Sequence, residues 1–326
     1  MLLPFALLFG LVVAIRRGLY AVRILKTHPI DAPVIVVGNI SAGGTGKTPV
    51  TIWLAKALKH SGRKPGIISR GYRGNVGRLP VEATANSDSG IVGDEAILLA
   101  TRCECPVVVH PDRVAAARKV IEMGANVVIS DDGLQHYRLG RNFEIVVVDG
   151  TRGFGNGKLL PAGPLREPVS RLSSVDSVLV HCRLEDDLDF FRRADDRTPL
   201  RFCLRVTAVS RLDDSEVRHI DDFSGQTVHA VAGIGHPERF FSMLEAHGLK
   251  VQRHPLADHA DIAPGDITFA DDLDVLMTAK DAVKCRWLDT GNCWYVSVDV
   301  EFEEADARML LEQVMDLQAG NRVVQS

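Results

Sequence analysis

Aromatic residues are scarce in this sequence, at 6% of 326 residues, and neither sign of charge dominates, with 38 Lys+Arg against 42 Asp+Glu. So few rings disfavour a single-stranded nucleic-acid platform built on base stacking. The net charge of −4 and the pI near 6.3 likewise disfavour a general polyanion binder. The six cysteines lack the paired CxxC spacing of a zinc site, and we interpret them as reduced thiols. The composition is therefore near the average of globular proteins, and the chain is long enough for two domains. We expect no nucleic-acid partner.

Acidic residues are also missing from the N-terminus, where none precedes Asp31. Leu2 to Ile15 is almost wholly apolar, yet a helix of that length measures only about 20 Å, short of a roughly 30 Å hydrocarbon core. Basic residues follow the apolar run instead of preceding it, which is unlike a secretory signal. They are Arg16, Arg17, Arg23 and Lys26. We therefore expect residues 1–26 to form a helix that dips into one leaflet, the alternative being a buried helix that covers the core.

A glycine-rich loop follows the first predicted strand, Pro33 to Gly38. The loop reads Ser41-Ala42-Gly43-Gly44-Thr45-Gly46-Lys47-Thr48. An amphipathic helix comes next, and Gly62 is expected to end it. Strand, loop, Gly-Lys-Thr and helix together predict a P-loop, although Ser41 replaces the first glycine of the pattern. Its backbone N–H groups would bind ATP phosphates, Lys47 would reach the β and γ oxygens, and Thr48 would ligate Mg²⁺.

Two motifs of other P-loop classes are absent. No Asn precedes a Lys anywhere in the chain, so the guanine-reading motif is missing. The second lysine of the membrane-associated partition ATPases is also missing, because Ala42 occupies its position. Both absences favour an ATP-using transferase over a nucleotide switch.

Apolar strands and helical patterns alternate along the first half of the chain. One strand, Asn126 to Ser130, ends on Asp131 and Asp132, and either carboxylate could hold Mg²⁺ directly or through water. The other strands are expected at residues 67–69, 107–109, 145–148 and 178–180. Such alternation predicts an α/β fold with a mainly parallel sheet covered by helices on both faces, as in P-loop NTPases.

The second half predicts a smaller α/β unit. Charged residues without apolar periodicity at 183–199 indicate a solvated helix or a linker. Further strands are expected at 202–206, 275–278 and 295–298, with a final helix from about Glu303 to Leu317. We therefore divide the chain into an N-terminal helix at 1–26, a P-loop kinase domain at 27–200 and a smaller C-terminal domain at 201–326.

Several longer stretches are not explained by a P-loop alone. They are Ser69–Tyr72, Val92–Ala96, Asp131–His136, Arg152–Glu167, Ala232–Phe241, Ala257–His259 and Met277–Cys285. Together with the P-loop, they closely resemble the tetraacyldisaccharide 4'-kinase family, the lipid A 4'-kinases of Gram-negative bacteria. The resemblance covers nearly the whole chain, and Ala279 departs from it by standing where the family usually has Glu.

This resemblance implies a reaction and a location. A family member uses ATP and Mg²⁺ to phosphorylate the 4'-hydroxyl of a tetraacylated glucosamine disaccharide 1-phosphate. It works at the cytoplasmic face of the inner membrane, and no protein partner is implied. The acylated lipid and the membrane surface are then the expected partners.

The resemblance also implies roles for individual residues. Asp94 matches the proposed catalytic base and His259 its partner, a reasonable pair because each stabilises the other's charged form. Glu95 matches a metal-site carboxylate and Asp131 the Mg²⁺ ligand, with Asp132 sharing or supporting either role. The residues expected to contact the sugar hydroxyls or the 1-phosphate are Arg70, Tyr72, Arg113, Gln135, His136, Asn156 and Arg166. We expect the glycine-rich segment 150–163 to be a loop that closes over the substrates.

Two other functions fit parts of the sequence. One is a non-transferase nucleotide switch that docks on membranes through its first helix. The other is a P-loop kinase for a soluble small molecule, which the apolar N-terminus and the family resemblance disfavour.

Overall fold

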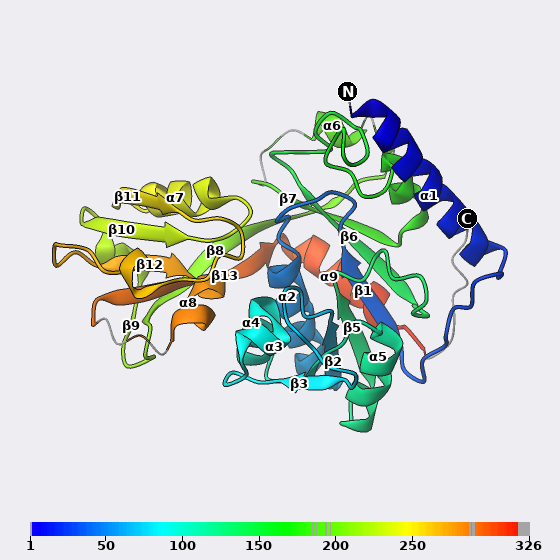
Figure 1. Ribbon diagram of the computed structural model, residues 1–326, viewed down its shortest axis with the longest axis horizontal. Helices are drawn as coiled ribbons and strands as arrows, with labels where there is room; N and C mark the ends of the chain where they lie inside the picture. The colour runs from blue at the N-terminus through cyan, green and yellow to red at the C-terminus, as the bar shows by residue number, and fades with distance from the viewer. Residues whose placement is uncertain are drawn as a thin grey trace.

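One β-sheet runs through the whole molecule and joins two lobes (Figure 1). The computed structural model describes residues 2–183, 186, 188–192, 194–195, 197–286, 288 and 291–318. The first lobe contains β1 (Val34–Gly38), β2 (Pro65–Ser69), β3 (Val81–Ala83), β4 (Val107–Val109), β5 (Val127–Asp131), β6 (Phe143–Asp149) and β7 (Ser177–His181). The second lobe contains β9 (Val217–Arg218), β10 (Thr227–Ala232), β11 (Lys250–Pro255) and β12 (Val275–Thr278). The lobes are joined by β8 (Leu200–Arg211) and β13 (Cys293–Phe302).

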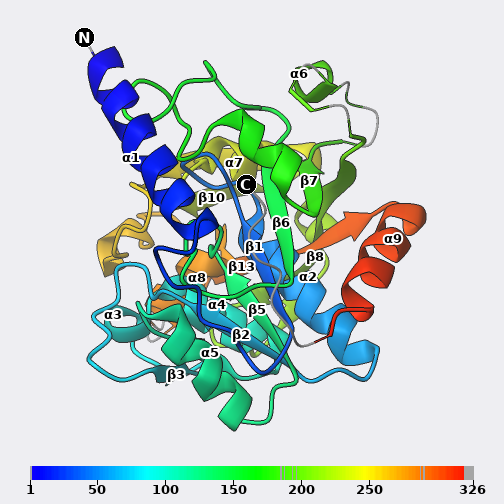
Figure 2. The ribbon, with the colours of Figure 1, turned by 90° about the vertical axis from the view of Figure 1, so that its right-hand side faces the viewer.

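Helices surround this sheet (Figure 2). The α-helices are α1 (Leu3–Ala21), α2 (Lys47–His60), α3 (Ser89–Val92), α4 (Asp94–Cys103), α5 (Arg113–Glu122), α6 (Asp189–Arg192), α7 (Pro237–Ala246), α8 (Ala279–Cys285) and α9 (Glu304–Met315). Short 3₁₀ helices lie at η1 (Val169–Ser174), η2 (Ile220–Phe223) and η3 (Pro264–Asp266). The solvated helix or linker predicted for 183–199 lies partly outside the described residues, and α6 forms within it.

Successive residues of β1 pack into two different cores. Val37 belongs to the core that includes Leu54 of α2 and Leu99 of α4. Val36 belongs to the core on the other face, which includes Ala116 of α5. Alternate residues of a strand point to opposite faces, so a strand that is apolar throughout requires cover on both sides. The predicted α/β fold with helices on both faces is confirmed.

The strand order places the P-loop strand near the centre of the first lobe. The order is β11-β10-β12-β13-β8-β7-β6-β1-β5-β2-β4-β3, with β9 paired to β8. β1 pairs in parallel with β5 on one side and with β6 on the other. Their carboxyl ends therefore meet at one edge of the sheet, where open α/β sheets bind their ligands.

The second half of the chain contributes to both lobes. β8 and β13 are longer than the strands predicted at 202–206 and 295–298, and they pair with each other in antiparallel fashion. The final helix α9 returns to the first lobe, where Leu310 and Val314 join the core containing Leu54. The division at residues 200 and 201 falls at the start of β8, and it stays a prediction.

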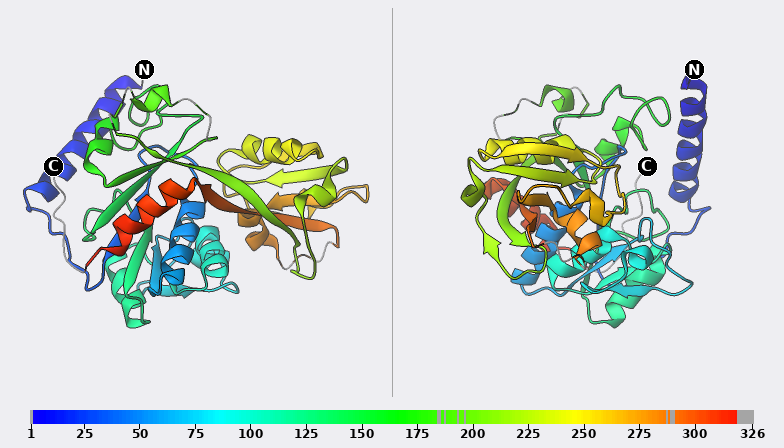
Figure 3. Two further views of the ribbon diagram at one scale, coloured as in Figure 1. Left: turned by 180° about the vertical axis from the view of Figure 1, so that it is seen from behind. Right: turned by 60° about the vertical axis from the view of Figure 1, so that its left-hand side comes forward.

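Helix α1 lies along the outside of the first lobe (Figure 3). With 19 residues and a mean hydropathy of 1.6, it is long and apolar enough to cross a membrane. Only 6% of its apolar stretch is buried inside the protein. At 1.5 Å per residue it is about 28 Å long, longer than the apolar run alone predicted. Large apolar side chains such as Phe5, Leu7 and Leu11 are exposed. The alternative of a buried helix over the core is therefore wrong.

A buried network of charges is centred on Glu144 of β6. Glu144 accepts hydrogen bonds from Arg141 at 2.8 Å and from Arg171 at 2.6 Å. Arg171 also pairs with Glu167 at 3.1 Å, and Glu167 accepts a hydrogen bond from Tyr137 at 2.8 Å. All these charged side chains are at most 8% exposed. The network therefore fixes the segment before η1, which carries the predicted substrate residue Arg166.

We expect Glu144→Gln to destabilise the protein by about 3–5 kcal/mol, because it removes the buried carboxylate that pairs with both Arg141 and Arg171, of which Arg171 retains Glu167. Chemical denaturation of the two proteins measures the difference. The matched control is Glu301→Gln, which removes the partner of Arg205 from an exposed pair and should cost less than about 1 kcal/mol. Equal losses in the two variants would contradict the importance of the buried network.

Candidate active site

A cavity of about 1390 Å³ separates the P-loop from the second lobe. Its walls include the P-loop, the end of β2, the start of α4, the loop after β11, the start of α8 and one side of α1. The lobes meet closely here, since a Cβ added to Gly235 would lie 3.3 Å from the backbone nitrogen of Gly44. The predicted nucleotide site and His259, one member of the predicted acid–base pair, thus line one cavity.

The P-loop has the backbone that phosphate binding requires. Gly43 and Gly46 have φ angles of 101° and 92°, which side-chain-bearing residues rarely adopt. The buried Asn39 donates to the carbonyl of Gly43 at 3.3 Å and so supports the loop from below. Residues 42–48 all line the cavity, whereas Ser41 pairs with Leu165. The start of α2 points into this loop, so free N–H groups are available for an anion.

The two carboxylates after β5 have different surroundings. Asp131 is 1% exposed and accepts a hydrogen bond from the Thr51 hydroxyl at 2.9 Å. Asp132 lines the cavity, 3.7 Å from the Lys47 ammonium and 3.2 Å from the Arg166 guanidinium. Its φ of 46° turns the chain sharply at this point. Asp132, rather than Asp131, therefore faces the space beside the P-loop lysine.

Their pKa values shift in opposite directions. Burial, with the nearby charges of Glu95 and Asp132, raises the pKa of Asp131 to about 7. Burial alone would also raise the pKa of Asp132, but Lys47 and Arg166 hold it below its usual range. A cation beside Asp131 would favour its ionised form, which is consistent with a metal close to these residues.

The oxygen donors suit Mg²⁺ better than a metal that needs many protein ligands. Thr48, Glu95 and Asp132 all line the cavity. Among the described residues, however, no group of three or more His, Cys, Asp or Glu side chains comes close enough to hold a metal ion alone. Mg²⁺ usually takes one or two carboxylates and completes its shell with water and substrate phosphates, so the donor set fits.

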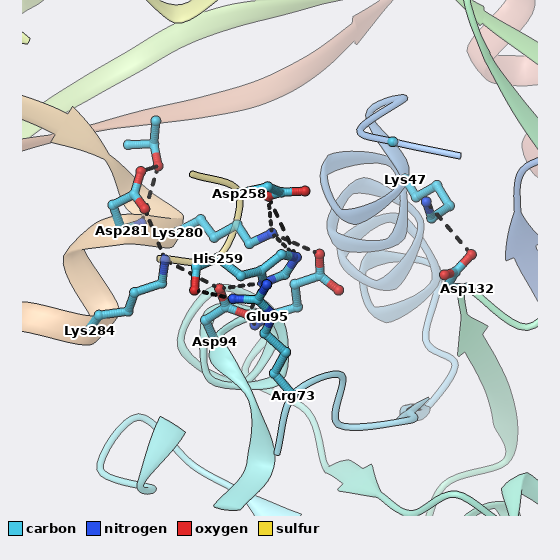
Figure 4. A network of polar contacts seen from close by, with 12 residues as sticks. Lys47, Arg73, Asp94, Glu95, Asp132, Asp258, His259, Lys280, Asp281 and Lys284 are labelled. Atoms are coloured by element: carbon cyan, nitrogen blue, oxygen red, sulfur yellow. Dashed lines mark hydrogen bonds and ion pairs between the residues drawn. The ribbon is translucent and has the colours of Figure 1, made fainter. Parts of the chain in front are cut away.

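The predicted acid–base pair joins the two lobes (Figure 4). His259 Nδ1 lies 3.0 Å and 3.2 Å from the two oxygens of Asp94, which opens α4. Both side chains are nearly buried, at 10% and 6% exposure. His259 itself lines the cavity, as does Glu95, which follows Asp94 in the first turn of α4. The φ of 58° at His259 is unusual for a residue with a Cβ, and the Arg73 guanidinium supports it by donating to its carbonyl at 2.8 Å.

Most of the predicted substrate residues reach the cavity. Those that line it are Arg70, Tyr72, Arg113, Gln135, His136 and Arg166. Asn156 does not, because its amide group bonds to Ala162 and Lys158 within its own loop. The cavity therefore has a strongly basic side opposite the second lobe.

Two of these residues have shifted pKa values. Burial lowers the pKa of Arg113 to about 10, and its guanidinium donates to the Asp131 carbonyl at 2.9 Å. Burial and the neighbouring arginines lower the pKa of His136 to about 4, so that it is neutral at physiological pH. His136 can thus donate to or accept from a sugar hydroxyl without adding charge.

Sequence reasoning missed several residues of the second lobe. Lys280 lies 3.0 Å from His259 Nε2 and 3.1 Å from Glu95, although its motif received no role. Arg239 of α7 crosses the cavity to Asp149, to Thr151 at 3.0 Å and to His181 at 3.0 Å. The family-like motifs contained both residues, but nothing in the sequence indicated which first-lobe groups they would meet.

Helix α1 also borders the cavity. Phe9, Val12, Val13 and Arg16 line it. Arg16 lies 5.8 Å above the ring of Tyr137, within reach of a cation–π contact. The helix that exposes apolar side chains to the outside therefore also contributes apolar side chains to the cavity wall.

Comparisons with known proteins point to one family. The profile of the family described as tetraacyldisaccharide-1-P 4'-kinase matches residues 1–316. A tetraacyldisaccharide 4'-kinase of Nitrosococcus oceani is 47% identical over 302 residues, which make up 92% of this chain and 86% of that protein. One of Alkalilimnicola ehrlichii is 47% identical over 307 residues, 94% of this chain and 90% of that protein. The crystal structure of LpxK from Aquifex aeolicus in complex with ATP matches with a TM-score of 0.80 and 28% identity, covering 97% of this chain and 98% of that one.

The raised pKa of Asp131 predicts a pH-dependent effect of Asp131→Asn on stability. The folded-state pKa of about 7 exceeds the unfolded value of about 3.9, so the folded protein holds a proton that the unfolded chain releases, and stability falls as pH rises between these values. Without metal at pH 8, the Asn variant should melt a few degrees above wild type, because the buried charge is gone. Below about pH 3.9, where the carboxyl group is protonated in the folded and the unfolded state alike, the two should melt together, and at pH 5 the difference should be smaller than at pH 8.

Thermal unfolding in a chelating buffer measures both midpoints. Asp132→Asn is the matched control, and it should not stabilise the protein at pH 8, because the ionised Asp132 is held by Lys47 and Arg166. An Asp131→Asn protein less stable than wild type at pH 8 would contradict the assignment of a penalty to this charge.

Proposed function

The chain belongs to the tetraacyldisaccharide-1-P 4'-kinase family, and we propose from the geometry of its cavity how its residues carry out that reaction. It is an ATP-dependent 4'-kinase of a lipid A precursor. The γ-phosphoryl group of ATP passes to the 4'-hydroxyl of a tetraacylated glucosamine disaccharide 1-phosphate. The observation that carries the residue assignment is the single cavity lined by the P-loop and by His259, whose Nδ1 lies 3.0 Å from Asp94.

The P-loop binds the nucleotide. Residues 42–48 surround the β- and γ-phosphates with N–H groups, and Lys47 balances the negative charge that the transferring group spreads over its oxygens. Thr48, Glu95 and Asp132, which line the cavity, would hold Mg²⁺ directly or through water, and the buried Asp131 would support them. When bound, Mg²⁺ neutralises phosphate charge and orients the γ-phosphoryl group for in-line attack.

The acid–base pair handles the proton. A new bond forms between the 4'-oxygen and the γ-phosphorus, while the bond from that phosphorus to the bridging oxygen breaks and ADP leaves. The hydroxyl proton goes to the carboxylate of Asp94, which His259 holds through Nδ1. A hydroxyl of high pKa needs such an acceptor as the bond forms.

The basic side of the cavity receives the sugars. Arg70, Arg113 and Arg166 line this side and suit hydroxyl groups or the 1-phosphate. The apolar side chains of α1 that border the same cavity suit the acyl chains. We place the enzyme at the cytoplasmic face of the inner membrane, with α1 in the bilayer and its following arginines at the anionic headgroups.

Lipid phosphorylation tests the assignment. With γ-labelled ATP and acylated disaccharide 1-phosphate, wild type should label the lipid, and Asp94→Ala should lower kcat by roughly 10²- to 10⁴-fold, the usual contribution of a general base. Lys47→Met should be similarly impaired. Glu301→Gln, on the exposed side of β13, serves as the control with full activity. ATP hydrolysis without any labelled lipid would point to a nucleotide switch instead.

Vesicle binding tests the role of α1. The full chain should sediment with vesicles that contain anionic phospholipid, and a chain starting at Asp31 should not, because the exposed apolar helix and its arginines are removed. Neutral vesicles should retain less of the full chain than anionic ones do. Equal sedimentation of the two chains would refute membrane attachment through this helix.

A further inference from the structure

Helix α8 directs two lysines toward the acid–base pair. Lys280 and Lys284 are one turn apart, so they extend from the same face of the helix. The Lys280 ammonium lies 3.0 Å from His259 Nε2 and 3.1 Å from Glu95 Oε1 (Figure 4). Lys284 lies 3.6 Å from Asp94 Oδ2 and donates to the carbonyl of Ala260 at 3.0 Å. Each member of the pair thus has a lysine beside it.

The contact with Lys280 determines which nitrogen of His259 carries the proton. An ammonium group has only donors, so Nε2 must accept its hydrogen bond. A neutral imidazole has one proton, which must then be on Nδ1. Nδ1 faces the Asp94 carboxylate at 3.0 Å, where an N–H donor is needed. Both contacts are satisfied only by this tautomer.

We propose that Lys280 is a positioning residue for catalysis: its hydrogen bond to Nε2 keeps the His259 proton on Nδ1 and holds the ring against Asp94. The proposal rests on the proposed function, in which Asp94 takes the hydroxyl proton. It also explains why the carboxylate has that role. Both nitrogens of His259 are engaged, so the carboxylate is the member of the pair that can take a proton, although its Oδ1 also accepts a hydrogen bond from the Glu95 backbone N–H at 2.9 Å.

The lysine is held in a fixed place by the fold. Asp281, which is fully buried, accepts hydrogen bonds from the Gly233 backbone at 3.0 Å and the Thr278 hydroxyl at 2.6 Å. The backbone of His259 donates to the carbonyl of the same Gly233 at 3.0 Å. A Cβ at position 233 would lie 2.9 Å from Asp281 Oδ1, so the close approach requires glycine. The helix that carries Lys280 and the loop that carries His259 are therefore tied to one point.

The charge of Lys280 is also maintained. Burial alone would lower its pKa, but the carboxylates of Glu95, Asp94 and Asp258 raise it above the ordinary value. The side chain is 17% exposed, so it stays a donor within the cavity wall. Because Lys280 also contacts the predicted metal ligand Glu95, the test must separate an effect on His259 from an effect on the metal.

Kinetics of three variants provide the first test. Lys280→Met should lower kcat for lipid phosphorylation by roughly 10- to 100-fold, part of what the base contributes, with KM for ATP and the Mg²⁺ dependence within about twofold of wild type. Lys280→Arg keeps a cationic donor and should recover part of the lost kcat. Lys250→Met removes an exposed lysine from β11 of the same lobe and should behave as wild type.

The ring nitrogens of His259 provide the second test. In long-range ¹H–¹⁵N spectra of the full chain, assigned by the loss of signals in His259→Gln, wild type should show protonated Nδ1 and unprotonated Nε2. In Lys280→Met, Nε2 should gain protonated character, and Lys280→Arg should restore the wild-type pattern. A Met variant with wild-type kcat, or with unchanged His259 signals, would overturn the proposal. So would a loss confined to the Mg²⁺ dependence, which would assign Lys280 to Glu95.

These outcomes are independent of the wider assignment. If Asp94→Ala abolishes lipid labelling while Lys280→Met changes neither kcat nor the His259 signals, the kinase assignment stands and the role of Lys280 fails. If Asp94→Ala labels lipid as wild type does, the catalytic role of the pair fails first.

Discussion

The hydrogen bond between His259 and Asp94 is the contact on which the site depends, because it joins groups from the two lobes across the cavity. Its formation requires the second lobe to lie at a fixed place beside the P-loop. The long strands β8 and β13 supply that placement by extending the first-lobe sheet without interruption into the second lobe. The close approach of Gly235 to the P-loop adds a second point of contact. The distance between the two side chains of this pair therefore depends on how precisely β8 and β13 place one lobe relative to the other.

Charge balance explains much of the remaining architecture of the cavity. Asp132 is paired with Lys47 and Arg166, and Glu95 is paired with Lys280. Among the carboxylates described near the P-loop, Asp131 stands out, since burial and neighbouring negative charge oppose its ionisation. A site prepared for a cation and a polyanion must carry such imbalance before they bind. Around Glu144, by contrast, the buried carboxylate is paired with two guanidinium groups.

Local patterns in the sequence were sufficient for the first lobe. The P-loop, the strand that ends at Asp131 and the end of α2 before Gly62 follow from apolar runs and glycine positions, and the structure has them where predicted. The lengths of β8 and β13 were underestimated, because polar residues on their exposed faces interrupt the apolar signal. The contact of Lys280 with Glu95 joins residues 185 positions apart, and those of Arg239 with His181 and Thr151 join residues 58 and 88 positions apart. A single sequence carries no signal for such tertiary contacts. Asn156 was predicted to contact the substrate because it lies in a motif, but its side chain donates a hydrogen bond to Ala162 within its own loop.

The position of α1 beside the cavity has a kinetic consequence. If the acyl chains enter along this helix, the enzyme meets its lipid while both are confined to the same surface. The relevant substrate concentration is then the mole fraction of the lipid among its bilayer neighbours, and diluting the membrane with inert phospholipid slows the reaction even when the amount per volume is constant. ATP reaches the cavity from the aqueous phase, so its saturation depends on its ordinary concentration per volume. The two substrates of one cavity would thus follow different concentration laws.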